Sequence, residues 1–197
     1  MDPEPGHDSI FVVGIGGSTR PGSSTEVVVQ AVLDGLGRAG AETRLYAGDQ
    51  LVLPMYEQSV SCADAGRQLV ADVRRADALV IGSPGYHGTI SGLVKNVLDY
   101  FEELSRDPAP YLDRKAVGCV ATAYGWQAAV NTLTTLRQTV HALRGWPTPY
   151  GIALNATGGL VNDDGTFKDE RQLLGIDVMV QQIVDFSRAM RALTPAR

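Results

Sequence analysis

The chain has 197 residues, a length that suits one well-buried domain or at most two small ones. Its net charge of −5, without any basic run, argues against nucleic-acid binding, and its 44% hydrophobic and 20% charged residues are ordinary for a soluble globular protein. No apolar stretch approaches the ~20 residues that span a bilayer, and segment 1–9 lacks the basic and apolar regions of a signal peptide. Cys62 and Cys119 form no CxxC motif, so we expect free thiols. The composition predicts a cytoplasmic protein without nucleic-acid or membrane partners.

Along the chain, apolar runs that suit strands alternate with amphipathic runs that suit helices. The predicted strands are residues 10–15, 42–46, 78–82, 116–122 and 150–154. The predicted helices are residues 24–38, 65–76, 93–104, 126–143 and 169–193. Between them we expect loops at 48–62, 83–92, 105–113 and 155–168, and a disordered lead at 1–8. The alternation predicts a single doubly wound α/β domain over residues 1–197, with a five-stranded parallel sheet and helices on both faces.

The stretch 12–25, VVGIGGSTRPGSST, joins the first predicted strand to the first predicted helix. The start of a helix presents unpaired backbone N–H groups and a partial positive charge, so it can receive an anion. Side chains that can donate hydrogen bonds are frequent here: Ser18, Thr19, Arg20, Ser23, Ser24 and Thr25. We interpret this loop as the phosphate cradle of flavin mononucleotide (FMN). As an alternative, Ser23 and Glu26 are spaced as a capping box, which would only begin the helix.

A dinucleotide site is a weaker interpretation of the same loop. Gly14 and Gly16 approach the dinucleotide fingerprint, but Thr19 stands where its third glycine belongs. The ribose-binding acid expected about 20 residues further on is also missing, since Tyr46 ends the second predicted strand and Asp49 falls later. The sequence therefore favours a mononucleotide.

The loop 83–92, SPGYHGTISG, contains three glycines and one proline. Such a backbone can approach a flat ligand closely, and its amides suit the polar edge of a flavin ring. Tyr86 can lie along an aromatic face. The alternative is an ordinary loop with a tyrosine on its surface, but together with the first loop we favour the flavin edge.

Three motifs, in this order, closely resemble the NAD(P)H-dependent FMN reductase family. They are GSTRPGS at 17–23, SPGYHG at 83–88 and SGLVKNVLD at 91–99. The resemblance extends over nearly the whole chain, including Leu53-Pro54 and residues 164–170. It implies a flavodoxin-like fold with strand order 2-1-3-4-5, FMN as the cofactor, and NADPH or NADH as the co-substrate.

The resemblance also implies roles for individual residues. Ser18, Arg20, Ser23 and Thr25 would hold the phosphate, with Ser24 as a further donor beside them. The flavin ring would lie against Ser83, Pro84, Gly85, Tyr86, His87 and Gly88. The third loop, which departs from the paired glycines common in the family, would add Thr122, Tyr124 and Gly125, and Tyr124 or Trp126 could wall the ring. Gly85 replaces a larger residue of many relatives, which would open the site to a different substrate.

Little catalysis is expected from the side chains, because the flavin itself carries the hydride chemistry. We expect no metal site and no catalytic residue, with His87 as a candidate proton donor by its position. Lys95 and Asp99 are one helical turn apart, and we interpret them as a structural pair.

The function implied is an FMN-dependent oxidoreductase that passes hydride from NAD(P)H to a small-molecule acceptor such as free flavin or a quinone. One alternative is an FMN-dependent dehydrogenase that acts on an organic ring compound in a biosynthetic pathway. Another is an electron-carrier flavodoxin, against which the modest net charge argues.

Apolar residues also occur in two otherwise polar loops, 50–62 and 105–113. They are Leu53, Met55, Tyr56 and Tyr111. Exposed apolar groups on loops suggest a partner surface, and relatives are dimers or tetramers. We therefore expect a homodimer or homotetramer.

Overall fold

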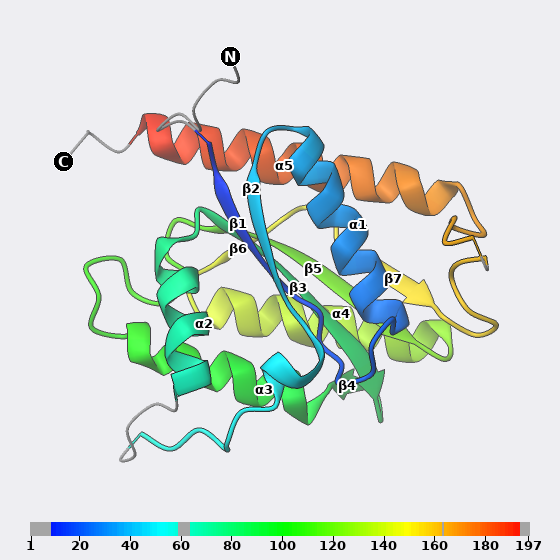
Figure 1. Ribbon diagram of the computed structural model, residues 1–197, viewed down its shortest axis with the longest axis horizontal. Helices are drawn as coiled ribbons and strands as arrows, with labels where there is room; N and C mark the ends of the chain where they lie inside the picture. The colour runs from blue at the N-terminus through cyan, green and yellow to red at the C-terminus, as the bar shows by residue number, and fades with distance from the viewer. Residues whose placement is uncertain (1–8, 59–63, 163, 194–197) are drawn as a thin grey trace.

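The computed structural model describes residues 9–58, 64–162 and 164–193, so the predicted lead 1–8 and Cys62 lie outside the described residues. One sheet lies between two layers of helices (Figure 1). The strands are β1 (Phe11–Ile15), β2 (Glu42–Tyr46), β3 (Ala78–Tyr86), β4 (Thr89–Ile90), β5 (Ala116–Ala123), β6 (Trp146–Pro147) and β7 (Ile152–Asn155). The α-helices are α1 (Ser24–Arg38), α2 (Asp64–Arg75), α3 (Gly92–Asp99), α4 (Trp126–Ala142) and α5 (Arg171–Ala192). Two short 3-10 helices are η1 (Gly48–Leu51) and η2 (Tyr100–Leu104).

The sheet has the order β2-β1-β3-β5-β6. Strand β7 also pairs with β5, further along that strand than β6 does. All these pairings are parallel. The five predicted strands correspond to β1, β2, β3, β5 and β7, so the predicted strand order 2-1-3-4-5 is confirmed. The predicted number of strands was wrong: the described residues form seven, because two-residue strands were missed at both β4 and β6.

The predicted loop 83–92 is largely a β-hairpin. Strand β3 continues to Tyr86, and β4 returns antiparallel to it. His87 and Gly88 form the turn with φ values of 54° and 83°, and two positive φ values are what a two-residue type I′ hairpin turn requires. The loop prediction was wrong here because glycine and proline are unusual inside strands, so the glycines and Pro84 indicated a loop.

Two helices also differ from the predicted ranges. The predicted helix 93–104 ends as α-helix at Asp99 and continues as η2. Helix α5 begins at Arg171 rather than at Asp169, because the Asp169 carboxylate accepts hydrogen bonds from the backbone and the guanidinium of Arg171. That pairing places Asp169 just ahead of the helix.

Side chains of the central strands alternate between two cores. Phe11, Val13 and Ile15 of β1 pack with α2, α3 and α4, whereas Val12 packs on the opposite face with α1 and α5. The helices divide in the same way in Figure 1, where α1 and α5 lie together on one side of the sheet. Burial on both faces explains why the sequences of the central strands are almost continuously apolar.

The part of the chain that the structure describes contains no helix long and apolar enough to cross a membrane. The cytoplasmic location stays a prediction.

Cys119 is a free, buried thiol in β5, and burial raises its pKa to about 12, so it is an inert core residue.

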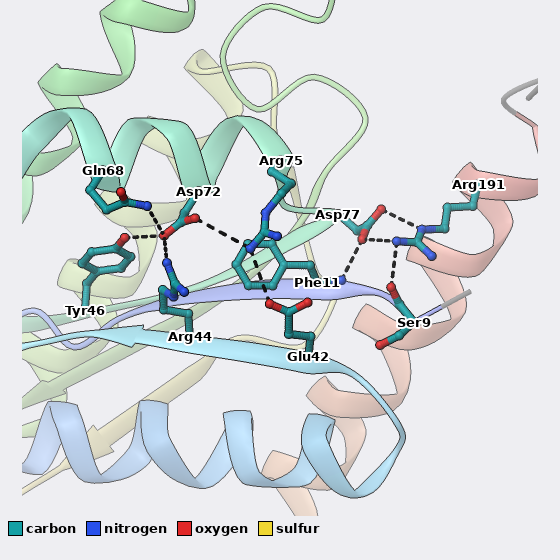
Figure 2. A network of polar contacts seen from close by, with 10 residues as sticks. All are labelled: Ser9, Phe11, Glu42, Arg44, Tyr46, Gln68, Asp72, Arg75, Asp77 and Arg191. Carbon is teal, nitrogen blue, oxygen red and sulfur yellow. Dashed lines mark hydrogen bonds and ion pairs between the residues drawn. The ribbon is translucent and has the colours of Figure 1, made fainter. Parts of the chain in front are cut away.

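Helix α2 is tied to the edge strand β2 by a buried carboxylate (Figure 2). Asp72 accepts hydrogen bonds from the Tyr46 hydroxyl, from Arg44 at 2.6 Å and from Gln68 at 3.4 Å. Burial alone would raise the pKa of Asp72, but these hydrogen bonds outweigh it and hold the pKa below its usual value. Burial, with the bond to Asp72, raises the pKa of Tyr46 to about 12.

A second polar network, also drawn in Figure 2, joins the two ends of the described chain. Asp77, just before β3, accepts from the backbone N–H of Phe11 at 2.7 Å and from the Arg191 guanidinium at 2.7 and 2.8 Å. Arg191 also donates to the carbonyl of Ser9 at 2.9 Å. The last turn of α5 is thereby fixed to the starts of β1 and β3.

The Asp72 network makes a pH-dependent contribution to stability. Asp72→Asn should lower the free energy of unfolding at pH 7 by about 1.5–3 kcal/mol, because a charged hydrogen-bond acceptor is lost. The deficit should shrink as the pH falls below about 4, where the carboxyl group of the unfolded wild-type chain takes up a proton, and it should disappear below the depressed pKa of the folded carboxylate. Urea unfolding at neutral and acidic pH measures both effects. Asp34→Asn, which removes an exposed bond to Gln30, is the matched control, and an equal deficit at both positions would contradict the assignment.

Candidate functional site

A cleft of about 300 Å³ opens where β1, β3 and β5 end. It is lined by Ser18, Thr19, Arg20, Ser23, Ser24, Thr25, Pro84, Gly85, Tyr86, Thr122, Ala123, Tyr124 and Ala156. Ten of the fourteen residues predicted to hold a cofactor are in this set. The other four, Ser83, His87, Gly88 and Gly125, are not, while Thr19, Ala123 and Ala156 were not among the predicted contacts.

The first loop lies directly against β3. Gly17 has a φ of +71°, and a Cβ atom at this position would lie 2.0 Å from the carbonyl oxygen of Gly82. Gly82 in turn has no room for a side chain, since a Cβ there would lie 2.6 Å from Val29 and 2.7 Å from Thr25 of α1. These two glycines let the loop and helix α1 approach the sheet, and the carboxyl end of β3 comes to lie beside the start of α1.

The start of α1 presents free donors to the cleft. Ser23 caps the helix by accepting from the backbone N–H of Glu26 at 3.2 Å, and its own N–H donates to the Arg20 carbonyl. Within the described ranges, the backbone N–H groups of Ser24 and Thr25 donate no hydrogen bond, and the Arg20 guanidinium has no partner. Two amides and a cation at one helix start are donors of the kind that an anion can bind.

The capping box is only half present, because the Ser23 N–H donates to Arg20 instead of to the Glu26 side chain. Glu26 lines a separate groove with Gln30, Asp34, Gly165 and Phe167 rather than the cleft. Its negative charge is therefore not directed at the place where an anion would bind.

Thr25 and Thr122 join α1 to β5. Their hydroxyl oxygens are 2.7 Å apart, and both side chains are almost completely buried. The Thr25 hydroxyl is thus engaged with Thr122, which leaves the backbone N–H of Thr25 as its donor to the cleft.

In the second loop, Pro84, Gly85 and Tyr86 reach the cleft, but Ser83 does not. The Ser83 hydroxyl is fully buried; it accepts from the backbone N–H of Ser91 at 3.0 Å and donates to the Pro84 carbonyl. Ser91 caps α3 by accepting from Val94 at 3.1 Å, so Ser83 anchors the hairpin to that helix. His87 lies in the hairpin turn outside the cleft lining, where it has no visible part in proton transfer.

Gly85 does not widen the cleft, contrary to expectation. A Cβ atom here would lie 2.7 Å from the Thr132 hydroxyl and 2.9 Å from Ala123, so the missing side chain faces α4 and β5. The glycine is instead required for close packing of the hairpin against α4.

The third loop contributes Tyr124 to the wall of the cleft. Tyr86 is 57% exposed and Tyr124 77% exposed, and both line the cleft. The loop is held by Asn155, whose carboxamide oxygen accepts from the backbone N–H of Gly125 and of Thr157, each at 3.0 Å. Sequence reasoning missed Asn155; an asparagine two residues before a threonine at a strand end was the available signal.

The residues that the structure describes include no group of three His, Cys, Asp or Glu side chains that could hold a metal ion. Lys95 and Asp99 form an exposed ion pair at 2.6 Å along α3, as predicted, and do not line the cleft.

A parallel sheet in the order 2-1-3-4-5, with a cleft at the carboxyl ends of its central strands, defines a flavodoxin-like fold. A model of the NADPH-dependent FMN reductase family matches residues 10–158. The chain belongs to this family.

Curated relatives include two proteins named FMN-dependent NADPH-azoreductase. That of Staphylococcus haemolyticus (strain JCSC1435) is 35% identical over 116 residues, which cover 58% of each chain. That of Staphylococcus aureus (strain USA300) is 35% identical over 113 residues, which cover 56% of each chain. The matches span a little over half the length of these relatives.

Two solved structures share the fold. FerB from Paracoccus denitrificans, described as a flavoenzyme NAD(P)H:(acceptor) oxidoreductase, has a TM-score of 0.71 and 17% identity, with 92% of this chain and 98% of FerB covered. RosB, with bound 8-demethyl-8-formylriboflavin-5'-phosphate, has a TM-score of 0.68 and 18% identity, with 95% and 82% covered.

The close approach of Gly17 to β3 gives a matched pair of substitutions. Gly17→Ala should lower the free energy of unfolding by about 3 kcal/mol or more, because it combines a left-handed backbone with a steric clash. Gly22→Ala, at φ +65° with no atom within 4 Å of the added Cβ, should cost only about 1–2 kcal/mol. Urea unfolding of both variants measures the difference. Equal costs would mean that the loop does not need its contact with Gly82.

Proposed function

We propose that the cleft binds FMN, with its phosphate at the start of α1. The observation that carries this proposal is the set of unpartnered donors there: the N–H groups of Ser24 and Thr25 and the guanidinium of Arg20. A phosphate ester would accept hydrogen bonds from all of them, and the hydroxyls of Ser18 and Thr19 are in the same wall. These residues fit the group that the family name implies.

The flavin ring would lie between the hairpin and the third loop. Pro84 and Gly85 offer main chain to its polar edge, and Tyr86 and Tyr124 offer aromatic faces. Thr122 lines this part of the cleft, and its hydroxyl is hydrogen-bonded to that of Thr25. Ser83 and Gly125 would not contact the ring themselves; their hydrogen bonds hold the hairpin and the third loop in place.

The proposed activity is transfer of hydride from NADPH or NADH to a small-molecule acceptor. Bound FMN supplies the chemistry, by accepting a hydride and passing reducing equivalents on. The residues of the chain would bind the cofactor and orient it, and two exposed tyrosines, Tyr86 and Tyr124, line the same cleft. Those tyrosines favour a flat acceptor, such as a quinone or free flavin. The names of similar proteins support this proposal: the azoreductases are called FMN-dependent and NADPH-dependent, and FerB is described as a flavoenzyme that uses NAD(P)H.

Reconstitution with FMN, followed by absorbance at the flavin and nicotinamide bands, tests the activity. NADPH or NADH should bleach the bound flavin, and a quinone should restore its colour. If neither nicotinamide bleaches the flavin but an organic ring compound does, the protein is the alternative dehydrogenase. A stable one-electron semiquinone on titration would instead favour the flavodoxin-type carrier.

Arg20→Ala should weaken FMN binding about 10- to 100-fold, because it removes a charge-assisted contact of about 1.5–3 kcal/mol. Quenching of FMN fluorescence on binding measures the affinity. Arg38→Ala, which removes an exposed cation at the other end of the same helix, is the control and should bind FMN like the wild type. Unchanged affinity in Arg20→Ala would place the phosphate elsewhere.

We also propose that the chain forms a homodimer or homotetramer through segment 51–58. Of the loop residues that suggested this surface, Leu53 is buried and Tyr56 and Tyr111 are half-buried, but Met55 is 81% exposed beside the exposed Val52. The segment is held rigidly, because the Asn96 side chain bonds the carbonyls of Leu53 and Pro54 and the N–H of Tyr56. An apolar side chain on a rigid loop supports an interface.

Met55→Glu should shift the mass measured by light scattering towards the monomer, because a charge would be buried in the interface. Val130→Glu, which alters an exposed apolar residue on α4, is the control and should leave the mass unchanged. A wild-type monomer at working concentration, or an effect of Val130→Glu alone, would contradict this surface.

A further inference from the structure

A second hollow, which we call the edge groove, lies beside β7 and is outside the cleft. Its volume is about 560 Å³, larger than that of the cleft. It is lined by Trp126 of α4, by Tyr150, by the outer side of β7 and by the start of α5. The two hollows adjoin, since Asn155 lines the groove and the next residue, Ala156, lines the cleft.

The outer side of β7 offers unpaired main-chain groups to this groove. The N–H of Ala156 donates to Ala123 of β5 at 2.8 Å, and inward and outward groups alternate along a strand. The N–H and C=O of Ala153 therefore point away from β5. In the described part of the sheet, β7 pairs with β5 alone, so these groups have no strand partner. Such an edge can bind the donor and acceptor atoms of a planar base.

Two aromatic side chains flank this edge. Trp126 is 60% exposed, and Tyr150 is partly exposed. Tyr150 is fixed, because its N–H donates to Gln182 at 2.9 Å and its ring lies against Gly175, where a Cβ atom would come within 2.6 Å of the hydroxyl. Tyr150 can therefore present its face to a flat ring without first being ordered, and Trp126 offers a second, exposed aromatic face.

Gln172 of α5 contributes a polar side chain to the groove. Its carboxamide oxygen is buried and accepts no hydrogen bond from any described residue, although Gln172 lines the groove. A buried acceptor without a donor is unfavourable, and turning the carboxamide towards the groove would let it accept a hydrogen bond from a ligand amino group. The one cation of the groove, Arg171, is held by Asp169 through three side-chain hydrogen bonds of 2.8–3.2 Å, so the groove suits a base better than a phosphate.

We propose that the edge groove binds the adenosine portion of the reduced nicotinamide dinucleotide. The inference rests on the proposed function, which places the nicotinamide end in the adjoining cleft. Adenine is flat, carries an amino donor for Gln172 and has acceptor nitrogens for the edge of β7. Trp126 would stack on it.

The test compares NADPH with reduced nicotinamide mononucleotide, which lacks the adenylate. In the FMN-loaded protein, Trp126→Ala should lower kcat/KM for NADPH about tenfold and leave kcat/KM for the mononucleotide unchanged. Trp146→Ala is the matched control: this tryptophan is 56% exposed, packs on Phe186 and does not line the groove, so neither value should change. Equal losses for both reductants, or no loss for either, would overturn the proposal.

Calorimetric titration with ADP-ribose, which lacks nicotinamide, separates this proposal from the proposed function. ADP-ribose should bind the wild-type protein and bind Trp126→Ala and Gln172→Leu at least several-fold more weakly. If it binds in this way but no nicotinamide reduces the flavin, the proposed function fails and the groove assignment stands. If the flavin is reduced but ADP-ribose does not bind, the groove assignment alone fails.

Discussion

The close contact between the first loop and strand β3 is the constraint on which the site depends. Gly17 can sit against the Gly82 carbonyl only without a side chain, and Gly82 admits α1 for the same reason. Helix α1 then lies so near the sheet that Thr25 reaches Thr122 across the end of β3. The ends of three parallel strands are thereby joined through one helix start, and donors from the first loop share a wall with main chain from the second and third. The cleft therefore depends on the missing side chains of Gly17 and Gly82 as much as on the side chains that line it.

Much of this arrangement could be predicted from the sequence, because the signals are local. Apolar runs buried on both faces marked β1, β3 and β5, and the hydroxyl-rich first loop pointed to the helix start that lines the cleft. The hairpin could not be predicted in the same way. A histidine in a positive-φ turn position is uncommon, and Pro84 and Gly85 argue against a strand unless the helix that packs on Gly85 is known.

Other features depend on contacts between distant segments. The predicted role of Ser83 as a ligand contact could not anticipate its bond to the backbone of Ser91, nor could the loop composition reveal that Leu53 is buried. The edge groove combines residues from α4, β7 and α5, whose proximity exists only in the folded chain. Asn155 lies at the junction of the two hollows, where its carboxamide fixes the third loop, so one side chain connects the geometry of both.

The network around Asp77 has a practical consequence. Through Arg191, it brings Ser9 beside the last turn of α5, at the end of the sheet where β1 and β3 begin. The cleft lies at the other end of the same strands. Ser9 and the last turn of α5 therefore lie together on the side of the sheet remote from the cleft. A fluorescent label or an electrode linker attached beside this network would hold the molecule with its cleft facing the solution.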